Sequence, residues 1–332
     1  MTGKELALEA LSGKKTPYIP AGFWFHFVDS DHYAAAPENR QLFRHTLEGH
    51  KKYFEKVGFE ILKIMSEGYF VFPGHREVSV EYPASLTTVK PSDRDSPWFD
   101  EQVSLVSELS RFVGKDAAVY YTIFSPFAYL SFSGLFRGEH VYDDAFAANW
   151  MSSTPEALQD ALGIVTQDAS ALIERILEEG GADGIFFAVR AYEGVSNEAY
   201  SRFIEPWERV VMEAVAKTGK RVILHICGDT RGDNDFARYA SYGAGAYNWA
   251  IDREGISLSQ GRQIFASRGV IGGFDHTAEG EIYRGDNEAI RKKIETILNE
   301  VDGGLMLGAH CALPPDIDYR NLICLRKLLR SG

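Results

Sequence analysis

Short apolar runs alternate with longer amphipathic stretches along the whole of the 332-residue chain. Runs in which nearly every position is apolar are typical of parallel strands, because such strands are buried on both faces. The pattern predicts strands at residues 19–27, 59–68, 117–124, 183–189, 222–225, 246–249, 270–273 and 304–308.

The stretches between these runs carry helix signals. Thr154 and Pro155, for example, provide an N-cap and a proline at the first helical position of a long helix that ends near Gly180. Helices are predicted at about 5–11, 37–57, 100–114, 154–180, 197–218, 233–241, 257–268, 287–301 and 319–329, with short helices over 125–150. Residues 71–97 are rich in proline and turn formers, and we expect a loop with a short hairpin, with His75 in solvent.

Strand and helix thus alternate to the end of the chain without a linker, a low-complexity segment or a sequence repeat. Eight strand–helix units with buried parallel strands are the pattern of a (β/α)8 barrel. The sequence therefore predicts an α/β protein with one TIM-barrel domain over residues 1–332.

Charge and composition exclude several partners. The formal net charge is −12, and no basic stripe is available to replace the counterions of a nucleic acid or to bind an anionic membrane. No run of about 18 apolar residues and no signal-peptide pattern occur. Three cysteines cannot all pair, which favours a reducing compartment. We expect a soluble, cytoplasmic protein.

Catalytic residues of barrels lie at the C-terminal ends of the strands. His225 and Cys227 follow one strand with a spacing of two, so their side chains point to the same side, and Cys311 follows the last strand. One imidazole and two thiolates leave the fourth position of a zinc ion open, as in catalytic sites. The alternative is that the cysteines are small buried hydrophobes and His225 a hydrogen-bonded core residue. The chain has only three cysteines and two of them follow predicted strands, which favours the metal site. The third, Cys324, lies on an apolar helix face and is expected in the core.

Four further residues are candidates by the same rule. Trp24 and His26 belong to the aromatic first strand and could bind substrate, although core packing is the alternative for the aromatic residues. Glu67 ends the second strand and Asp275 follows the seventh, so both are candidate catalytic residues. A solvated loop carboxylate is the alternative for Glu67.

Two stretches of the C-terminal half resemble a known family. His225-Ile226-Cys227-Gly228-Asp229, and Gly303 to Cys311 followed by Pro314-Pro315, resemble the uroporphyrinogen decarboxylase superfamily. They are most similar to the branch that transfers methyl groups between corrinoids and thiols. The opening helix and the Pro20-led segment are similar to the start of the family domain, so the resemblance extends over essentially the full length. It implies a catalytic zinc on His225, Cys227 and Cys311.

The sequence departs from the decarboxylases in two places, and it also lacks the signature of a corrinoid-binding module. The region after the first strand has no arginine and carries Asp29 and Asp31, which argues against a porphyrinogen substrate. Glu67 falls roughly where the decarboxylases have an aspartate, but its arginine partners are missing. The segment Asp275-His276-Thr277-Ala278-Glu279-Gly280 has the wrong spacing for a corrinoid-binding signature. Any corrinoid is therefore expected on a separate partner protein.

The resemblance implies a zinc-dependent methyltransferase that moves a methyl group from a methylated corrinoid to a small-molecule thiol. Glu67 or Asp275 would occupy the fourth zinc position until the thiol arrives, and Asp229 or Asp252 would orient His225. Two alternatives remain. One is a metal-independent lyase that acts on a smaller carboxylate, with His225 and Cys227 lining its pocket. The other is a non-catalytic binding or regulatory barrel.

Overall fold

Seven parallel strands form a single curved sheet in which each strand pairs with the next along the chain. The computed structural model describes residues 1–141, 144–228 and 232–330. The strands are β1 (Ile61–Ile64), β2 (Ala118–Phe124), β3 (Gly184–Val189), β4 (Arg221–Ile226), β5 (Ala246–Trp249), β6 (Gly269–Phe274) and β7 (Leu305–Ala309). The prediction of an α/β barrel is confirmed, with one difference at the first predicted strand.

Residues 19–27 do not form a regular strand. The backbone lies extended beside β7, where Gly22 N donates to Leu307 O at 2.9 Å and Leu307 N donates to Pro20 O at 2.9 Å. Isolated parallel bridges also join Ala21 to Leu307 and Phe25 to Leu313. The segment occupies the place of the eighth strand without completing a ladder, partly because Pro20 has no N–H to donate.

Carboxylates replace backbone acceptors on the other side of this segment. The amide of Ala21 donates to Glu60 Oε2 at 3.1 Å, and the amide of Phe27 donates to Glu67 Oε1 at 2.7 Å. Glu60 and Glu67 flank β1 in sequence. Two side chains therefore join the segment to the β1 side of the barrel, where the sequence pattern predicted a strand pair.

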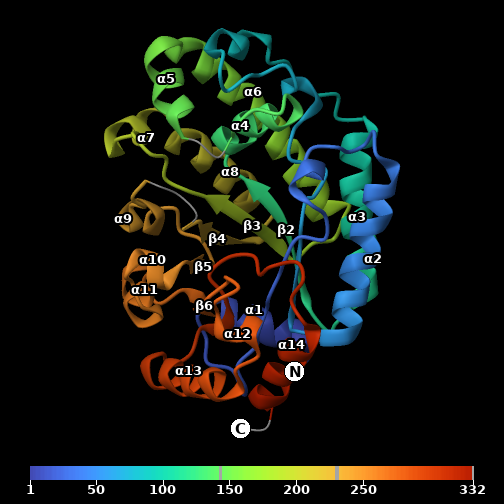
Figure 1. The fold of residues 1–332 in the computed structure, drawn as a ribbon, viewed down its shortest axis with the longest axis vertical. Coiled ribbons are helices and arrows are strands. Elements are labelled where there is room, and N and C mark those ends of the chain that lie inside the picture. The colour runs from blue at the N-terminus through green and yellow to red at the C-terminus, as the bar shows by residue number, and fades with distance from the viewer. Residues whose placement is uncertain (142–143, 229–231, 331–332) are drawn as a thin grey trace.

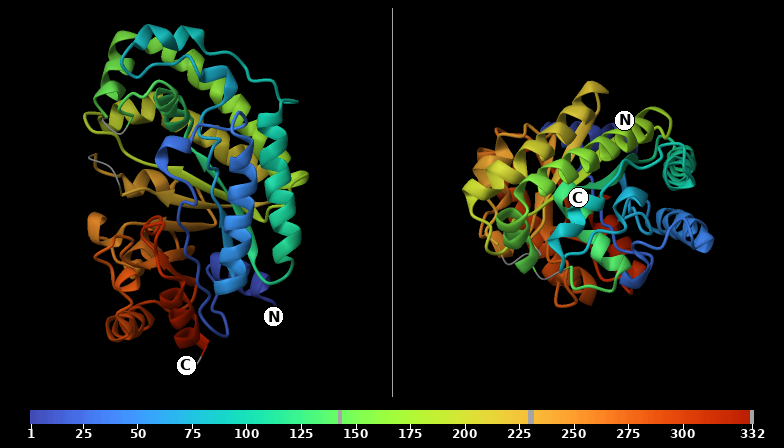
Figure 2. Two further views of the ribbon diagram at one scale, coloured as in Figure 1. Left: turned by 45° about the vertical axis from the view of Figure 1, so that its right-hand side comes forward. Right: turned by 90° about the horizontal axis from the view of Figure 1, so that it is seen from above.

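Helices surround the sheet (Figure 1), and α2 and α3 run side by side along one flank in both Figure 1 and Figure 2. The helices are α1 (Gly3–Leu11), α2 (Arg40–Val57), α3 (Pro97–Val113), α4 (Pro126–Phe136), α5 (Ala145–Ser153), α6 (Pro155–Glu178), α7 (Asn197–Phe203), α8 (Glu205–Lys217), α9 (Phe236–Ala240), α10 (Ile251–Glu254), α11 (Leu258–Ile264), α12 (Glu281–Arg284), α13 (Asn287–Glu300) and α14 (Tyr319–Arg330). None of the helices in the described ranges is both long and apolar enough to cross a bilayer.

Two helical predictions were wrong in detail. The single helix expected over 197–218 is broken between α7 and α8, because Pro206 lies in the first turn of α8 and cannot continue a preceding helix. The helix expected from residue 37 begins at Arg40, where the side chain of Asn39 caps the N-terminus by accepting from Gln41 N.

The hairpin expected within residues 71–97 is absent, since this fully described segment contains only the 3₁₀ turns Pro73–His75 and Pro83–Thr88 before α3 begins. His75 is buried rather than solvated. Its Nε2 lies 3.5 Å from Asp168 of α6, which also accepts from Ser92 N at 2.9 Å. These contacts hold the loop against α6.

The interior of the barrel is apolar. Side chains from successive strands meet there in one buried cluster, and α1 covers it with Ala7 and Leu11. The other members are Trp24, Ile61, Met65, Ala118, Tyr120, Phe186, Ile223, Ala246, Ile271 and Met306. A larger second cluster fills the space between the sheet and the surrounding helices.

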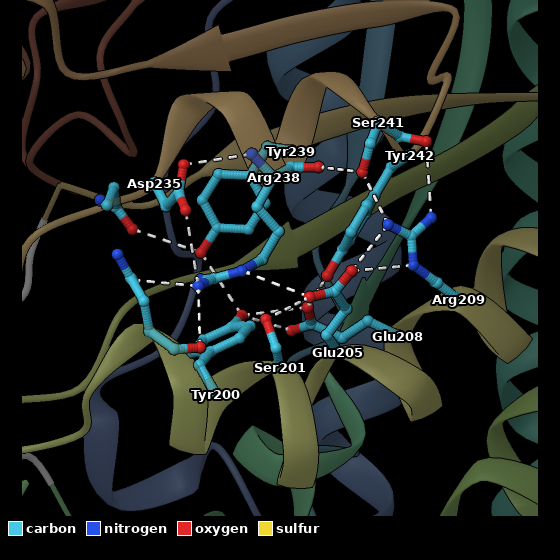
Figure 3. A network of polar contacts seen from close by, with 12 residues as sticks. Tyr200, Ser201, Glu205, Glu208, Arg209, Asp235, Arg238, Tyr239, Ser241 and Tyr242 are labelled. Carbon is cyan, nitrogen blue, oxygen red and sulfur yellow. Dashed lines mark hydrogen bonds and ion pairs between the residues drawn. The ribbon is translucent and has the colours of Figure 1, made fainter.

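Outside the sheet, α7, α8 and α9 enclose a polar network (Figure 3). Its centre is Glu208, which is fully buried. The Tyr200 hydroxyl lies 2.9 and 3.0 Å from the two carboxylate oxygens, and the Tyr242 hydroxyl donates at 2.6 Å. Arg238 lies over the Tyr200 ring at 4.1 Å and 3.5 Å from Glu205. Burial raises the pKa of Glu208 to about 6, although these hydrogen bonds oppose the shift.

The Glu208 pKa predicts how stability changes with pH. Between the ordinary carboxyl pKa and about 6, the folded protein keeps a proton that the unfolded chain has released. Stability should therefore fall as pH rises through this range, by about 2 kcal/mol, and remain lower above it. Glu208→Gln is neutral at every pH and should remove this fall in urea unfolding measured from pH 4.5 to 7.

Glu213→Gln, on the exposed face of α8, is the matched control and should keep the wild-type profile. A Glu208→Gln protein with the same pH profile as the wild type would contradict the assignment.

Candidate functional site

His225, Cys227 and Cys311 converge at the C-terminal mouth of the barrel. His225 belongs to β4, Cys227 follows it directly, and Cys311 follows β7. Their donor atoms all lie within 4.8 Å of one another, and Cys311 Sγ is 3.6 Å from His225 Nε2. β5 and β6 separate β4 from β7 in the sheet, so the curvature of the barrel creates this group.

Asn248 on β5 determines which nitrogen of His225 is available. The Asn248 amide group donates to Ile271 O at 2.9 Å and to Ala309 O at 3.1 Å. Its Oδ1 must therefore accept from His225 Nδ1, at 2.6 Å. The Nδ1–H is thus held by Asn248, and Nε2 is the nitrogen that faces Cys311. A ligand histidine needs this tautomer.

The sequence analysis missed Asn248, although an asparagine inside a four-residue buried strand was a usable signal. Asp252, proposed there as a partner of His225, lies instead 3.9 Å from His310 Nδ1. That proposal was wrong, since Asn248 takes the position. The other proposed partner, Asp229, lies outside the described residues.

Backbone contacts also position the cysteines. The Cys227 amide donates to Val189 O at 2.9 Å, and Asn234 Nδ2 donates to Cys227 O at 3.0 Å. The Cys227 thiol beside Cys311, together with His225, holds the pKa of Cys311 well below its usual range despite burial. Low thiol pKa values favour the thiolate, which is the form that metals bind. The third cysteine, Cys324, is half-buried on α14 rather than fully in the core.

A cavity of about 460 Å³ opens above these three residues. Its wall is mainly aromatic and apolar, and His225, Cys227 and Cys311 are all part of its lining. The aromatic residues of the wall are Trp24, Tyr33, Phe70, Phe124, Phe132, Phe186 and Tyr192. Such a shape, apolar with a few polar groups, is typical of a small-molecule site.

The structure places the predicted substrate residues on this cavity and the first predicted catalytic residue behind it. Trp24 and His26 both line the cavity. Glu67 is fully buried and is not among the lining residues, and its Oε1 lies 3.2 Å from His26 Nδ1 while it accepts from the Phe27 amide. Glu67 thus contacts the back of His26 and does not join the His225 group.

Asp275 is also separate from that group. Its carboxylate lies within 4.8 Å of donor atoms of His276 and His310, in a second group. Among the described residues, no further His, Cys, Asp or Glu joins His225, Cys227 and Cys311 at that separation. The structure therefore brings the three predicted ligands together and leaves both predicted carboxylates outside.

Lys63 is the other residue that the sequence analysis missed. It interrupts the apolar strand β1, and its side chain enters the barrel and lines the cavity. Its ammonium lies 3.1 Å from Met65 Sδ and 4.3 Å from the centre of the Phe186 ring. No carboxylate of the described residues is within ion-pair distance of it. Burial lowers its pKa to about 8, while Cys311, Glu67 and Cys227 act in the opposite direction.

Known proteins resemble this chain in both sequence and fold. Two methylcobamide:CoM methyltransferases MtbA match part of it. The protein of Methanosarcina mazei is 25% identical over 154 residues, 46% of this chain and 42% of the relative. The protein of Methanosarcina acetivorans is 26% identical over 124 residues, which are 37% of this chain and 34% of the relative. The chain thus matches less than half the length of these curated relatives.

A solved structure described as a methyltransferase from Methanosarcina mazei has the same fold. It superposes with a TM-score of 0.68 at 15% identity, covering 100% of this chain and 99% of the other. The sequence profile of the family described as uroporphyrinogen decarboxylase (URO-D) matches residues 72–331. Because this match spans most of the chain, from before β2 to the end of α14, the chain belongs to the uroporphyrinogen decarboxylase family.

Proposed function

We propose that this protein is a methyltransferase that moves a methyl group from a methylated corrinoid, carried by a separate partner protein, to a small-molecule thiol. The observation that carries the proposal is the group of His225, Cys227 and Cys311 on the floor of the cavity. The names of the MtbA relatives, methylcobamide:CoM methyltransferases, support the reaction class.

The donor atoms fit a zinc ion. One imidazole nitrogen and two sulfurs are ligands that zinc prefers, and three protein ligands leave a position for a substrate. Asn248 binds the Nδ1–H of His225 and so leaves Nε2 as the nitrogen that would bind a metal. A bound zinc would lower the pKa of an incoming thiol and keep it as a thiolate.

The remaining chemistry is done by the chain itself. In this proposal the thiolate sulfur attacks the methyl carbon: the sulfur–carbon bond would form as the cobalt–carbon bond of the donor breaks, and the corrinoid would leave with that electron pair as cobalt(I). The aromatic wall of the cavity keeps water from the sulfur. Lys63 lines the same cavity and contributes a positive charge that balances an added anion. His26 lines the cavity, with its Nδ1 3.2 Å from the buried Glu67, and would contact the substrate there.

One observation favours a second candidate function. Lys63 and Arg190 place two cationic groups on the cavity wall; Arg190 is paired with Asp144, so Lys63 is the group that could bind a substrate carboxylate. A metal-independent lyase that acts on a small carboxylate would use Lys63 in this way. Removal of metal separates the candidates, since the lyase would keep its activity and the methyltransferase would lose it.

The cysteine ligands can be tested with cobalt, which absorbs strongly by charge transfer when thiolates bind it. The protein loaded with Co²⁺ should show this absorption, and Cys227→Ala and Cys311→Ala should each reduce or abolish it because each removes a sulfur ligand. Cys324→Ala is the matched control and should keep the wild-type spectrum, since Cys324 lies on α14. Unchanged spectra in both ligand variants would refute the assignment.

The reaction itself is tested with methylcobalamin as the methyl donor and a series of thiols that includes 2-mercaptoethanesulfonate. Thioether formation should require zinc and should fall at least about a hundredfold in Cys311→Ala. Calorimetry in two buffers of different ionisation enthalpy should count about one proton released per thiol bound, because the site takes the thiolate. Thiol binding without zinc-dependent proton release, and no methyl transfer, would favour the lyase.

Lys63 should show a conflict between stability and function. Below pH 8 the Lys63 ammonium is charged in both the folded and the unfolded protein, and its burial lowers stability by the full amount. Between pH 8 and about 10.5 the folded protein has released this proton while the unfolded chain still holds it, so the loss of stability becomes smaller as pH rises. Lys63→Met should therefore stabilise the metal-free protein at pH 7 by about 2–3 kcal/mol, and by less at pH 9.5.

The same variant should bind thiols more weakly, because the positive charge on the cavity wall is lost. Urea unfolding at both pH values and thiol titrations would measure the two effects. Lys56→Met, at an exposed position of α2, is the control and should change neither. A Lys63→Met protein that is less stable at pH 7 would show that the ammonium has a partner in the folded state.

A further inference from the structure

A second group of metal-ligating side chains lies beside the first. Asp275 and His276 follow β6, and His310 follows β7. Their donor atoms all lie within 4.8 Å of one another, and none of them belongs to the His225 group. The sequence analysis proposed Asp275 as a candidate for the fourth zinc position beside His225, Cys227 and Cys311. Its neighbours in the fold are two histidines.

His310 is buried and one of its ring nitrogens has no partner. The residue is 3% exposed. Its Nδ1 faces the Asp252 carboxylate at 3.9 Å, whereas Nε2 is buried without a hydrogen-bond partner. At 3.9 Å the Asp252 carboxylate attracts the imidazole without hydrogen-bonding to it. Buried polar atoms are normally satisfied, so the unpartnered Nε2 of this buried histidine is available to bind a cation.

His276 repeats this feature. Its Nδ1 is buried without a hydrogen-bond partner and lies 3.8 Å from Asp275 Oδ1. The Asp275 carboxylate is oriented by Thr277, whose amide and hydroxyl each donate to it at 2.9 Å. Each carboxylate oxygen has a second lone pair, so these bonds leave Asp275 able to bind a cation. The side chains of Asp275 and His276 are about a third exposed, which gives an ion access from solvent.

We propose that Asp275, His276 and His310 bind a second divalent transition-metal ion, separate from the His225 site. Two imidazoles and a carboxylate suit zinc, cobalt, nickel or iron(II), and they form a harder donor set than one with two thiolates. Donor atoms around such an ion stand roughly 3.3 Å apart at zinc–nitrogen distances of about 2.0 Å. The three donor atoms, which lie within 4.8 Å of one another, would have to approach to this separation when the ion binds.

The test compares metal content among variants of the untagged 332-residue chain. Each protein is stripped of metal, equilibrated with zinc under reducing conditions, desalted and analysed. The wild type should hold two zinc ions per chain. The double variant Cys227→Ala/Cys311→Ala should hold one, and Asp275→Asn/His276→Ala should also hold one. Asn at position 275 can still accept from the Thr277 amide through its oxygen, and its NH2 group can donate to the Thr277 hydroxyl, so the turn should be kept.

Cobalt distinguishes which site each variant retains. The Asp275→Asn/His276→Ala protein should keep the thiolate-to-cobalt absorption, and the double cysteine variant should bind cobalt without it. His310→Ala should weaken the second ion at least about tenfold. His140→Ala removes an exposed histidine and should change nothing. Circular dichroism melting confirms that each variant is folded.

Two results would overturn the second site: no zinc in the double cysteine variant, or an Asp275→Asn/His276→Ala protein that holds as much zinc as the wild type. The inference does not rest on the proposed methyl transfer. Failure of the first site would appear as cysteine variants that keep the full zinc content and the cobalt absorption, whereas failure of the second would appear in the Asp275 and His310 variants.

Discussion

The hydrogen bonds of one buried amide, that of Asn248, hold together the part of the barrel on which the candidate site depends. Asn248 is on β5, and its three bonds reach His225 on β4, Ile271 on β6 and Ala309 on β7. The side-chain NH2 group of Asn248 donates both of its hydrogens to backbone carbonyls, so its Oδ1 is turned toward His225. The same side chain thus sets the spacing of four strands and the tautomer of the histidine.

The barrel interior contains few polar groups among the described residues, and burying each of them lowers the stability of the fold unless it is hydrogen-bonded or paired. The lumen is otherwise filled with residues such as Trp24, Phe186 and Met306. Asn248 and His225 are hydrogen-bonded to each other, whereas the contacts of the Lys63 ammonium with the described part of the chain are to a sulfur and aromatic rings. Departures from good packing are expected at functional sites, and Lys63 lies on the cavity wall.

The contact between the extended segment 19–27 and the β1 side closes the barrel and also supports a residue at its mouth. Glu60 and Glu67 bind backbone amides of the extended segment in place of a strand ladder. Glu67 also contacts His26, so the carboxylate that makes this contact supports a residue of the cavity rim. This explains why Glu67 is buried behind the cavity instead of lining it.

The order of the seven strands and of the long helices between them, and the placement of His225 and Cys227 on one side, were determined by the sequence alone, because both follow from local periodicity. The apolar runs marked all seven strands, and a spacing of two put both ligands on one side. The barrel rule then placed Cys311 at the same mouth. Tertiary structure decided the rest. The partner of His225, the burial of Lys63 and the neighbours of Asp275 depend on which strands the curved sheet brings together. Residues 19–27 had the pattern of a strand, but two carboxylates distant in sequence took up backbone amides that a ladder would have used. A local pattern contains no information about such contacts.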